Sequence, residues 1–225
     1  MIFVNFKTYP QGTGERALEL AKICEEVSKS SGVTIIPVIQ AVDLTLIKKA
    51  VSIPVWVQHL DQFPQGKFTG WINLEAVIEA GAEGTLLNHS EHQLPPGMVK
   101  QVISRAKGEV KSGKKENFEV MVCAKTFGQA KRLAKLKPDF LAYEPVELIG
   151  NRGKSVASER PKTIKKIAEA ISVPLVVGAG IHSQEDVKIS LKMGAKGILV
   201  ATDVVLSRDP RKALVELIDG FKGDK

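Results

Sequence analysis

Short apolar runs alternate with amphipathic stretches along nearly the whole chain. The apolar runs, each of strand length, are Ile2–Phe6, Val33–Ile39, Pro54–Gln58, Gly84–Asn88, Phe118–Cys123, Asp139–Tyr143, Pro174–Gly178 and Gly197–Ala201. The stretches between them place apolar residues three and four positions apart, as at Ala17, Leu20, Ala21, Cys24 and Val27. The runs predict buried parallel strands, and the stretches between them predict helices.

Several predicted helices also carry start or stop signals. Asp209-Pro210 is typical of an N-cap followed by a first-turn proline, and Ser183 with Asp186 forms a capping box. Gly32 and Gly194 are placed to end helices. These signals support the division of the chain into eight strand–helix units.

Eight such units within 225 residues predict an α/β fold, a closed (β/α)8 barrel with short loops. An open doubly wound sheet is the main competing fold. The longest polar stretch, Lys107 to Asn117, lies between a helical pattern and an apolar run, so we interpret it as a surface connection. We therefore expect one domain spanning residues 1–225.

Composition narrows the class of protein. The net charge is +7, but the lysines are interleaved with Asp and Glu, and two tyrosines and two tryptophans offer little stacking surface for bases. This disfavours nucleic-acid binding, although a positive field would help to recruit a small anion. The segment Ile2–Val4 is too short for a signal sequence, and no apolar stretch reaches membrane-spanning length. We expect a soluble, cytoplasmic protein that does not bind membranes.

The two cysteines, Cys24 and Cys123, lie among apolar residues and form no Cys-x-x-Cys pair. We expect both to be buried free thiols, as suits a reducing compartment. No set of His, Cys, Asp and Glu residues has convincing metal-ligand spacing, so no metal is predicted.

The sixth apolar run ends at Glu144, with Pro145 directly behind it and a loop containing Gly150 beyond. Pro145 has no N–H to continue a strand ladder, so the strand must end at Glu144. Active sites of barrels lie where strands end and loops begin, and a carboxylate there, under a loop that could close, is a natural general base.

The ends of the first and fourth apolar runs supply side chains that could act together with Glu144. Period-two alternation places Asn5 and Lys7 on one face with Phe6 opposite, and extension of the Lys7 side chain to solvent is the alternative. His89 could polarise a carbonyl or move a proton, and Glu91 could hold Lys7; a packed, hydrogen-bonded His89 is an equal alternative. The remaining histidines, His59, His92 and His182, are assigned no catalytic role.

Small residues end the last two runs, at Gly178-Ala179-Gly180 and at Ala201-Thr202. Barrels often hold a phosphate on backbone amides at these two loops, although glycines also serve tight turns. Ser183 stands where a dinucleotide fingerprint needs its third glycine. The near match to a P-loop at residues 108–115 is rejected because Lys115 replaces the magnesium-binding Ser or Thr.

Taken together, several ordered motifs resemble triosephosphate isomerase over essentially the whole chain. They are Asn5-x-Lys7, Asn88-His89-Ser90-Glu91, Ala142-Tyr143-Glu144-Pro145-Val146 with Ile149-Gly150, Gly178-Ala179-Gly180 and Ala201-Thr202. The short length and Asn88 before the histidine resemble the compact archaeal branch. Asn88-His89-Ser90 also fits an N-glycosylation sequon, which we discount because nothing indicates secretion.

The resemblance implies cofactor-free interconversion of dihydroxyacetone phosphate and D-glyceraldehyde 3-phosphate in glycolysis and gluconeogenesis. It implies that Glu144 is the base, that neutral His89 polarises the substrate oxygens and that Lys7 offsets negative charge. The family is the standard example of a glutamate base paired with a neutral histidine. It also implies that the substrate site includes Asn5, Ile149, Gly150, Gly180, Ala201 and Thr202. The backbone amides around Gly150, Gly180, Ala201 and Thr202 would hold the phosphate. Another phosphate-binding barrel isomerase or aldolase, or a non-catalytic phosphate-binding barrel, is the alternative.

Two departures from the family pattern affect the periphery. The loop after Glu144 reads Asn151-Arg152-Gly153 where the family usually has Gly-Thr-Gly, which makes its tip longer and more basic. The segment 66–70 resembles the loop that reaches into a neighbouring subunit, but Trp71 replaces the polar residue usual there. We expect a homo-oligomer, dimer or tetramer, with altered contacts.

Overall fold

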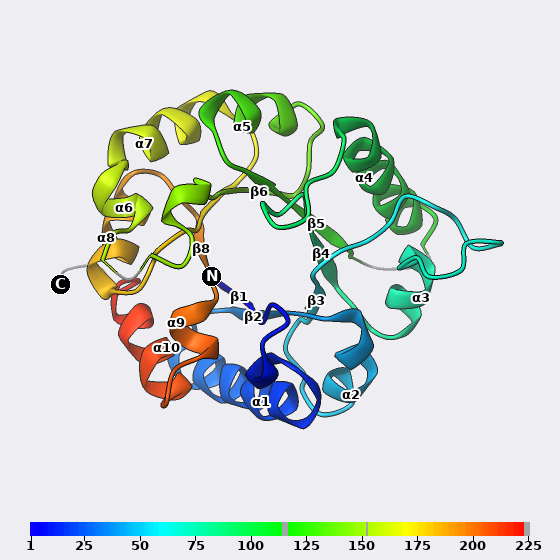
Figure 1. Cartoon of the computed structure of the whole chain (residues 1–225), viewed down its shortest axis with the longest axis horizontal. Helices are drawn as coiled ribbons and strands as arrows, with labels where there is room; N and C mark the ends of the chain where they lie inside the picture. The colour runs from blue at the N-terminus through cyan, green and yellow to red at the C-terminus, as the bar shows by residue number, and fades with distance from the viewer. Residues whose placement is uncertain (114–116, 152, 223–225) are drawn as a thin grey trace.

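Eight parallel strands close into a barrel in chain order, because β1 pairs with both β2 and β8 (Figure 1). The structure is a computed structural model that describes residues 1–113, 117–151 and 153–222. The strands are β1 (Ile2–Asn5), β2 (Ile35–Ile39), β3 (Trp56–Val57), β4 (Gly84–Leu87), β5 (Glu119–Ala124), β6 (Phe140–Tyr143), β7 (Leu175–Val177) and β8 (Gly197–Val200). Each lies within one residue of a predicted apolar run, so the closed barrel is confirmed and the open sheet is excluded.

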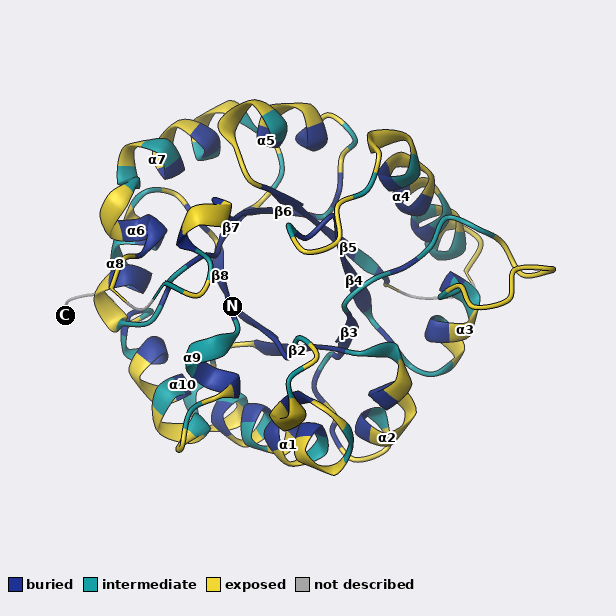
Figure 2. Cartoon of the chain, viewed as in Figure 1, coloured by how far each residue is buried: buried dark blue, intermediate teal, exposed yellow. Residues whose placement is uncertain are grey.

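The helices form a ring outside the strands, with their buried residues facing the barrel (Figure 2). They are α1 (Gly14–Ser31), α2 (Leu44–Lys48), α3 (Leu74–Glu79), α4 (Pro96–Lys111), α5 (Phe127–Ala134), α6 (Val156–Glu159), α7 (Pro161–Ala170), α8 (Gln184–Lys192), α9 (Thr202–Val205) and α10 (Pro210–Asp219). Short 3-10 turns occur at η1 (Pro10–Gly12), η2 (Ala41–Asp43) and η3 (Val146–Leu148). Within the described parts of the chain, no helix is long and apolar enough to cross a membrane.

The predicted helix ends are confirmed where the structure describes them. Asp209 accepts the Lys212 N–H at the start of α10, and Ser183 and Asp186 form a reciprocal capping box on α8. Gly32 follows α1 with a left-handed φ of 72°. The stretch predicted to be a surface connection from Lys107 onward is helical as far as Lys111, because α4 extends further than its apolar stripe suggested. Residues 114–116 of that stretch, including Lys115, lie outside the described residues.

Two apolar cores flank the strands. One fills the barrel and contains the rings of Phe3, Trp56 and Phe140, with Phe3 and Trp56 centroids 4.9 Å apart. The other lies between the strands and the helices and contains Phe6. The inward position of Phe3 carries Asn5 into the barrel mouth, because alternate residues of a strand share a face. The predicted opposition of Asn5 and Phe6 is therefore confirmed.

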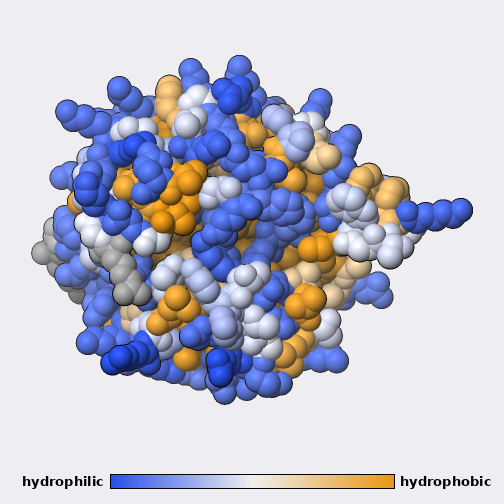
Figure 3. Space-filling model, in the orientation of Figure 1, coloured by the Kyte–Doolittle hydropathy of each residue, from blue (hydrophilic) through white to orange (hydrophobic). Residues whose placement is uncertain are grey.

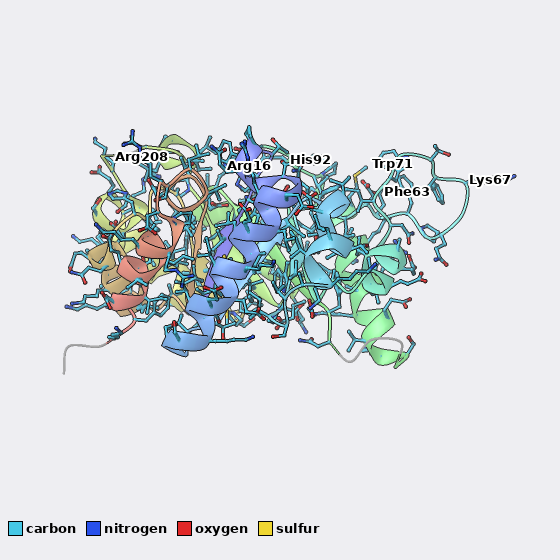
Figure 4. All side chains as sticks on the ribbon, turned by 90° about the horizontal axis from the view of Figure 1, so that it is seen from below. Arg16, Phe63, Lys67, Trp71, His92 and Arg208 are labelled. Carbon is cyan, nitrogen blue, oxygen red and sulfur yellow. The ribbon has the colours of Figure 1, made fainter. Side chains whose placement is uncertain are left out.

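All strands run in the same direction, so their carboxyl ends and the loops that follow them gather at one end of the barrel. Figure 4 shows His92, Phe63 and Trp71, which lie in loops after strands, at this end, together with Arg208 from the turn between α9 and α10. One of these loops, residues 61–73 between β3 and α3, projects from the barrel as an arm (Figure 1). This end of the barrel is where the candidate residues are expected to meet.

Candidate active site

The predicted site residues do meet at this end. A single pocket is lined by Asn5, Lys7, His89, Glu144, Ile149, Gly150, Ala179, Gly180, Ile181, Leu199, Val200, Ala201, Thr202 and Asp203. Glu91 lines an adjoining hollow that shares Lys7 and His89 with the pocket. The face of the barrel that carries these loops is shown in Figure 3. The fold thus gathers every predicted residue from segments far apart in the sequence.

Glu144 lies directly after β6, where its N–H still donates to the Ala124 carbonyl at 2.9 Å. Pro145 follows and ends the ladder, as predicted. The residue is only 6% exposed, and Oε2 has no hydrogen-bond partner among the described residues. This oxygen lies 3.5 Å from Nε2 of His89. A buried carboxylate with an uncommitted oxygen is well suited to accept a proton.

The space for this carboxylate is provided by Gly178 and bounded by Cys123. A Cβ on Gly178 would lie 2.6 Å from Oε1 of Glu144, so a larger residue would displace the carboxylate. Burial, then the charge of nearby Glu144, raises the pKa of Cys123 well above its usual range, so the thiol lies beside this carboxylate. Cys123 was predicted as a buried free thiol, which is confirmed, but its contact with Glu144 was missed. Its position at the end of an apolar run was the available signal.

His89 follows Asn88, which adopts a left-handed φ of 58° immediately after β4. The residue is 7% exposed, and its Nδ1 accepts the backbone N–H of Glu91 at 3.2 Å. Because this bond occupies the lone pair of Nδ1, the neutral ring carries its hydrogen on Nε2. The donor therefore points toward Glu144 and the pocket.

Lys7 is held in an unusual backbone conformation, with φ at 51°. Its N–H donates to Oδ1 of Asn5 at 3.0 Å, and its Nζ lies 2.5 Å from Oε1 of Glu91, the partner proposed from the sequence. Its carbonyl accepts the amide of Gln58 at 2.9 Å, and the same amide reaches Asn5. Left-handed backbone is costly for a residue with a side chain, so these bonds must hold it. Gln58 was missed, although it ends the third apolar run.

The two small-residue loops face the pocket from the side of β7 and β8. Ala179 and Gly180 both have left-handed backbone, with φ of 74° and 71°. A Cβ on Gly180 would collide with the Lys154 carbonyl, so the loop after β7 and the loop after β6 pack backbone to backbone. The hydroxyl of Thr202 lies 3.3 Å from that of Tyr9, a residue that no sequence motif indicated.

The loop from Pro145 to Ser155 borders the pocket and is anchored at its far end. The Ser155 hydroxyl donates to Asp186, and the Val156 N–H donates to the Ala179 carbonyl at 3.0 Å. Asn151 accepts the Gly153 N–H at 2.9 Å, but Arg152 lies outside the described residues. Among the residues that the structure describes, no group of three or more His, Cys, Asp and Glu is arranged to hold a metal ion.

Known proteins match this chain over almost its full length. The sequence profile of the family described as Triosephosphate isomerase matches residues 1–219. A triosephosphate isomerase of Methanothermus fervidus is 41% identical over 224 residues, which cover 97% of each chain. That of Methanocaldococcus jannaschii is 40% identical over 223 residues, covering 97% of this chain and 98% of its own. That of Methanosarcina barkeri is 37% identical over 222 residues, 96% of each.

Proposed function

The chain belongs to the triosephosphate isomerase family, and we propose that Glu144, His89 and Lys7 carry out its interconversion of dihydroxyacetone phosphate and D-glyceraldehyde 3-phosphate. One observation carries the assignment. The free oxygen of Glu144 and the N–H of His89 face each other 3.5 Å apart at the edge of the pocket. A base and a hydrogen-bond donor so placed can act on a carbon-bound proton and on the neighbouring oxygen of one small substrate.

In the proposed reaction, the carboxylate of Glu144 removes a proton from the substrate carbon beside the carbonyl. The C–H electron pair moves into a carbon–carbon double bond, and the carbonyl oxygen gains negative charge to give an enediolate. The hydroxyl proton on the deprotonated carbon then passes to the charged oxygen, and the electron pair it leaves forms the new carbonyl. The double-bond electrons take back the proton from Glu144 at the former carbonyl carbon, so no atom is gained or lost overall. Burial of Glu144 favours this exchange because the carboxylate is not surrounded by competing water.

His89 would stabilise the enediolate by donating from Nε2 to its oxygens. Glu91 fixes the direction of this donor through its own N–H. A neutral imidazole is a better match here than an imidazolium, and triosephosphate isomerases are the standard example of a glutamate base paired with a neutral histidine. Lys7, in the same pocket, would offset the negative charge of the phosphate and the enediolate.

The phosphate would lie on the backbone amides of Gly150, Gly180, Ala201 and Thr202, which line the same pocket as the catalytic side chains. An enediolate phosphate eliminates phosphate readily in water, so the loop from Pro145 to Ser155 would close over it. Its rigid anchor at Ser155 and its left-handed Gly150, with φ of 70°, suit a movable segment between fixed ends. Ile149 would cover the substrate from this loop.

The proposal requires no metal or cofactor, and a coupled assay tests it. Purified protein is given D-glyceraldehyde 3-phosphate in the presence of EDTA, and the product is reduced by glycerol-phosphate dehydrogenase while NADH absorbance is followed. Turnover that EDTA leaves unchanged supports the assignment. An absence of turnover, or turnover that appears only with added metal, contradicts it.

We also propose that the protein is a homo-oligomer in which the arm contacts a second copy. The arm is ordered by Asp61–Ile72 hydrogen bonds at its base, and it presents Phe68 and Trp71, which are 37% and 51% exposed. In this proposal the arm of the second copy would lie over the hollow beside Lys7 and Glu91. Sedimentation analysis of the wild type and of Trp71→Asp tests this, since the substitution should shift the mass toward the monomer.

The domain organisation, metabolic role and location that we propose follow from the family and the fold. We propose a single domain, because the closed barrel uses strands from Ile2 to Val200 and α10 packs against α1. A role in glycolysis and gluconeogenesis and a cytoplasmic location accord with the activity. Limited proteolysis that released a stable fragment would contradict the single domain.

A further inference from the structure

The side chain of Asn88 forms an unusual bridge beneath the loop that carries His89. Its Nδ2 donates to the Cys123 carbonyl at 2.8 Å, and its Oδ1 accepts the Leu94 N–H at 2.9 Å. The amide orientation is fixed, because a carbonyl can only accept and a backbone N–H can only donate. Asn88 is 3% exposed, so this amide is committed at both ends inside the protein.

The backbone of Asn88 is equally specific. Its φ of 58° is left-handed, a conformation that asparagine tolerates better than most residues and that glycine adopts freely. The left-handed residue turns the chain sharply out of β4 and directs the next residue, His89, into the pocket. A packing role alone would not require a residue that both adopts this turn and offers a donor and an acceptor.

The bridge closes the loop that sets the His89 ring. Within the loop, the Glu91 N–H donates to Nδ1 of His89, and the His92 N–H donates to the His89 carbonyl at 2.9 Å. The loop runs from Asn88 to Leu94, and the hydrogen bond from the Leu94 N–H to the Asn88 side chain holds its two ends together. The other end of the same amide is fixed to β5, through the carbonyl of the residue whose thiol contacts Glu144.

We propose that Asn88 is a positioning residue for the isomerisation, holding the His89 ring in the orientation and tautomer that direct Nε2 toward Glu144 and the substrate. This inference rests on the proposed function of His89. The same burial means that the asparagine of the Asn88-His89-Ser90 sequon is not accessible for glycosylation in the folded protein, because its amide is hydrogen-bonded inside the protein. Displacements of catalytic groups by about 1 Å can cost on the order of 100-fold in rate, so loss of the bridge should lower turnover more than binding.

The test compares Asn88→Gly with the wild type. Glycine keeps the left-handed backbone and removes both hydrogen bonds, so the expected result is a kcat lower by about 10- to 100-fold with KM changed less than about threefold. Long-range ¹H–¹⁵N spectra should show the His89 ring leaving its fixed Nε2–H tautomer, with His89→Gln identifying its signals among four histidines. The matched control is Lys137→Gly. Lys137 is exposed, has a left-handed φ of 57° and precedes β6, at the end of the barrel away from the pocket, so this substitution should leave kcat unchanged.

Asn88→Asp gives a second reading if the glycine variant does not fold. It retains an acceptor for Leu94 and loses the donor to Cys123, so kcat should fall and the His89 ring signals should shift away from those of the wild type. A folded variant with kcat within twofold of wild type and unchanged His89 signals overturns the proposal, even if its melting temperature falls. A wild type without isomerase activity would refute the proposed function instead, while the ring spectra of the free protein would still test the positioning.

Discussion

The backbone N–H of Glu91 donates to Nδ1 of His89 at 3.2 Å, while the carboxylate of the same Glu91 lies 2.5 Å from Nζ of Lys7. One residue therefore orients two candidate catalytic groups, one through its backbone and one through its side chain. The backbone bond matters more for the chemistry, because it determines which ring nitrogen of His89 carries the hydrogen.

The first prediction concerns this hydrogen. In ¹⁵N spectra near neutral pH, Nδ1 of His89 should give the signal of an unprotonated nitrogen and Nε2 that of a protonated one. His89→Gln should lower kcat by about 10²- to 10³-fold, because it removes an oriented donor to the enediolate. A ring protonated on Nδ1, or a glutamine variant with near wild-type kcat, would contradict the role given to His89.

The second prediction concerns Lys7. Lys7→Met should raise KM and lower kcat, reducing kcat/KM by roughly 10²- to 10³-fold, because it removes the cation that would offset the charge of the phosphate and the enediolate in the proposed reaction. Steady-state kinetics at several ionic strengths provide the measurement, and the wild-type KM should rise with added salt. Lys165→Met, on the exposed face of α7, is the matched control and should change neither constant.

The sequence predicts the barrel and the members of the site more fully than it predicts their fine geometry. Periodicity identifies the strands because every strand is buried on both faces and reads as a short apolar run. Candidate residues then follow from strand ends, and the ion pair of Lys7 with Glu91 could be anticipated from charge alone. The ordered family motifs supply the chemistry that periodicity does not.

The residues that were missed act through contacts that no local pattern encodes. Gln58 holds Lys7 through a backbone carbonyl, and Cys123 meets Glu144 because neighbouring strands are in a particular register. The left-handed backbone of Asn88 and Ala179 is also invisible in the sequence, since neither residue is glycine. Such features depend on register and on backbone dihedral angles, which only the assembled barrel determines.

The third prediction concerns the space around Glu144. Gly178→Ala should still fold, because the atoms nearest the new Cβ, which are Oε1, Cγ and Cδ, all belong to the side chain of Glu144 and none to the backbone. The displaced carboxylate should lower kcat by about tenfold or more while phosphate-analogue binding persists. Gly108→Ala, where nothing lies within 4 Å of the new Cβ, should leave kcat unchanged and stabilise α4 by about 0.5–1 kcal/mol. Equal kinetics for the two variants would remove Gly178 from the site.

The fourth prediction concerns the buried thiols. Burial raises the pKa of Cys24 to about 12, whereas an exposed thiol ionises near pH 8.5. The folded protein therefore retains a proton that the unfolded chain loses, so the free energy of unfolding should fall as the pH rises above about 8.5, by up to about 1.4 kcal/mol per pH unit for this thiol.

Urea unfolding at pH 7 and pH 10 measures this dependence, and Cys24→Ala should show a shallower decline than the wild type. In the native state at pH 8, neither cysteine should react with a thiol reagent such as DTNB before the protein unfolds. Rapid modification of the folded protein, or an identical pH dependence in Cys24→Ala, would refute the prediction.

The central claim, that Glu144 transfers the proton, is tested most directly by kcat of Glu144→Gln measured alongside binding of a phosphoglycolate-type analogue. Glu119→Gln, a half-buried glutamate at the start of β5, is the matched control and should turn over normally. The account predicts that Glu144→Gln loses kcat by several orders of magnitude while the analogue still binds, because the lost group acts on a proton and not on the anion. A Glu144→Gln enzyme with kcat near that of the wild type would contradict it.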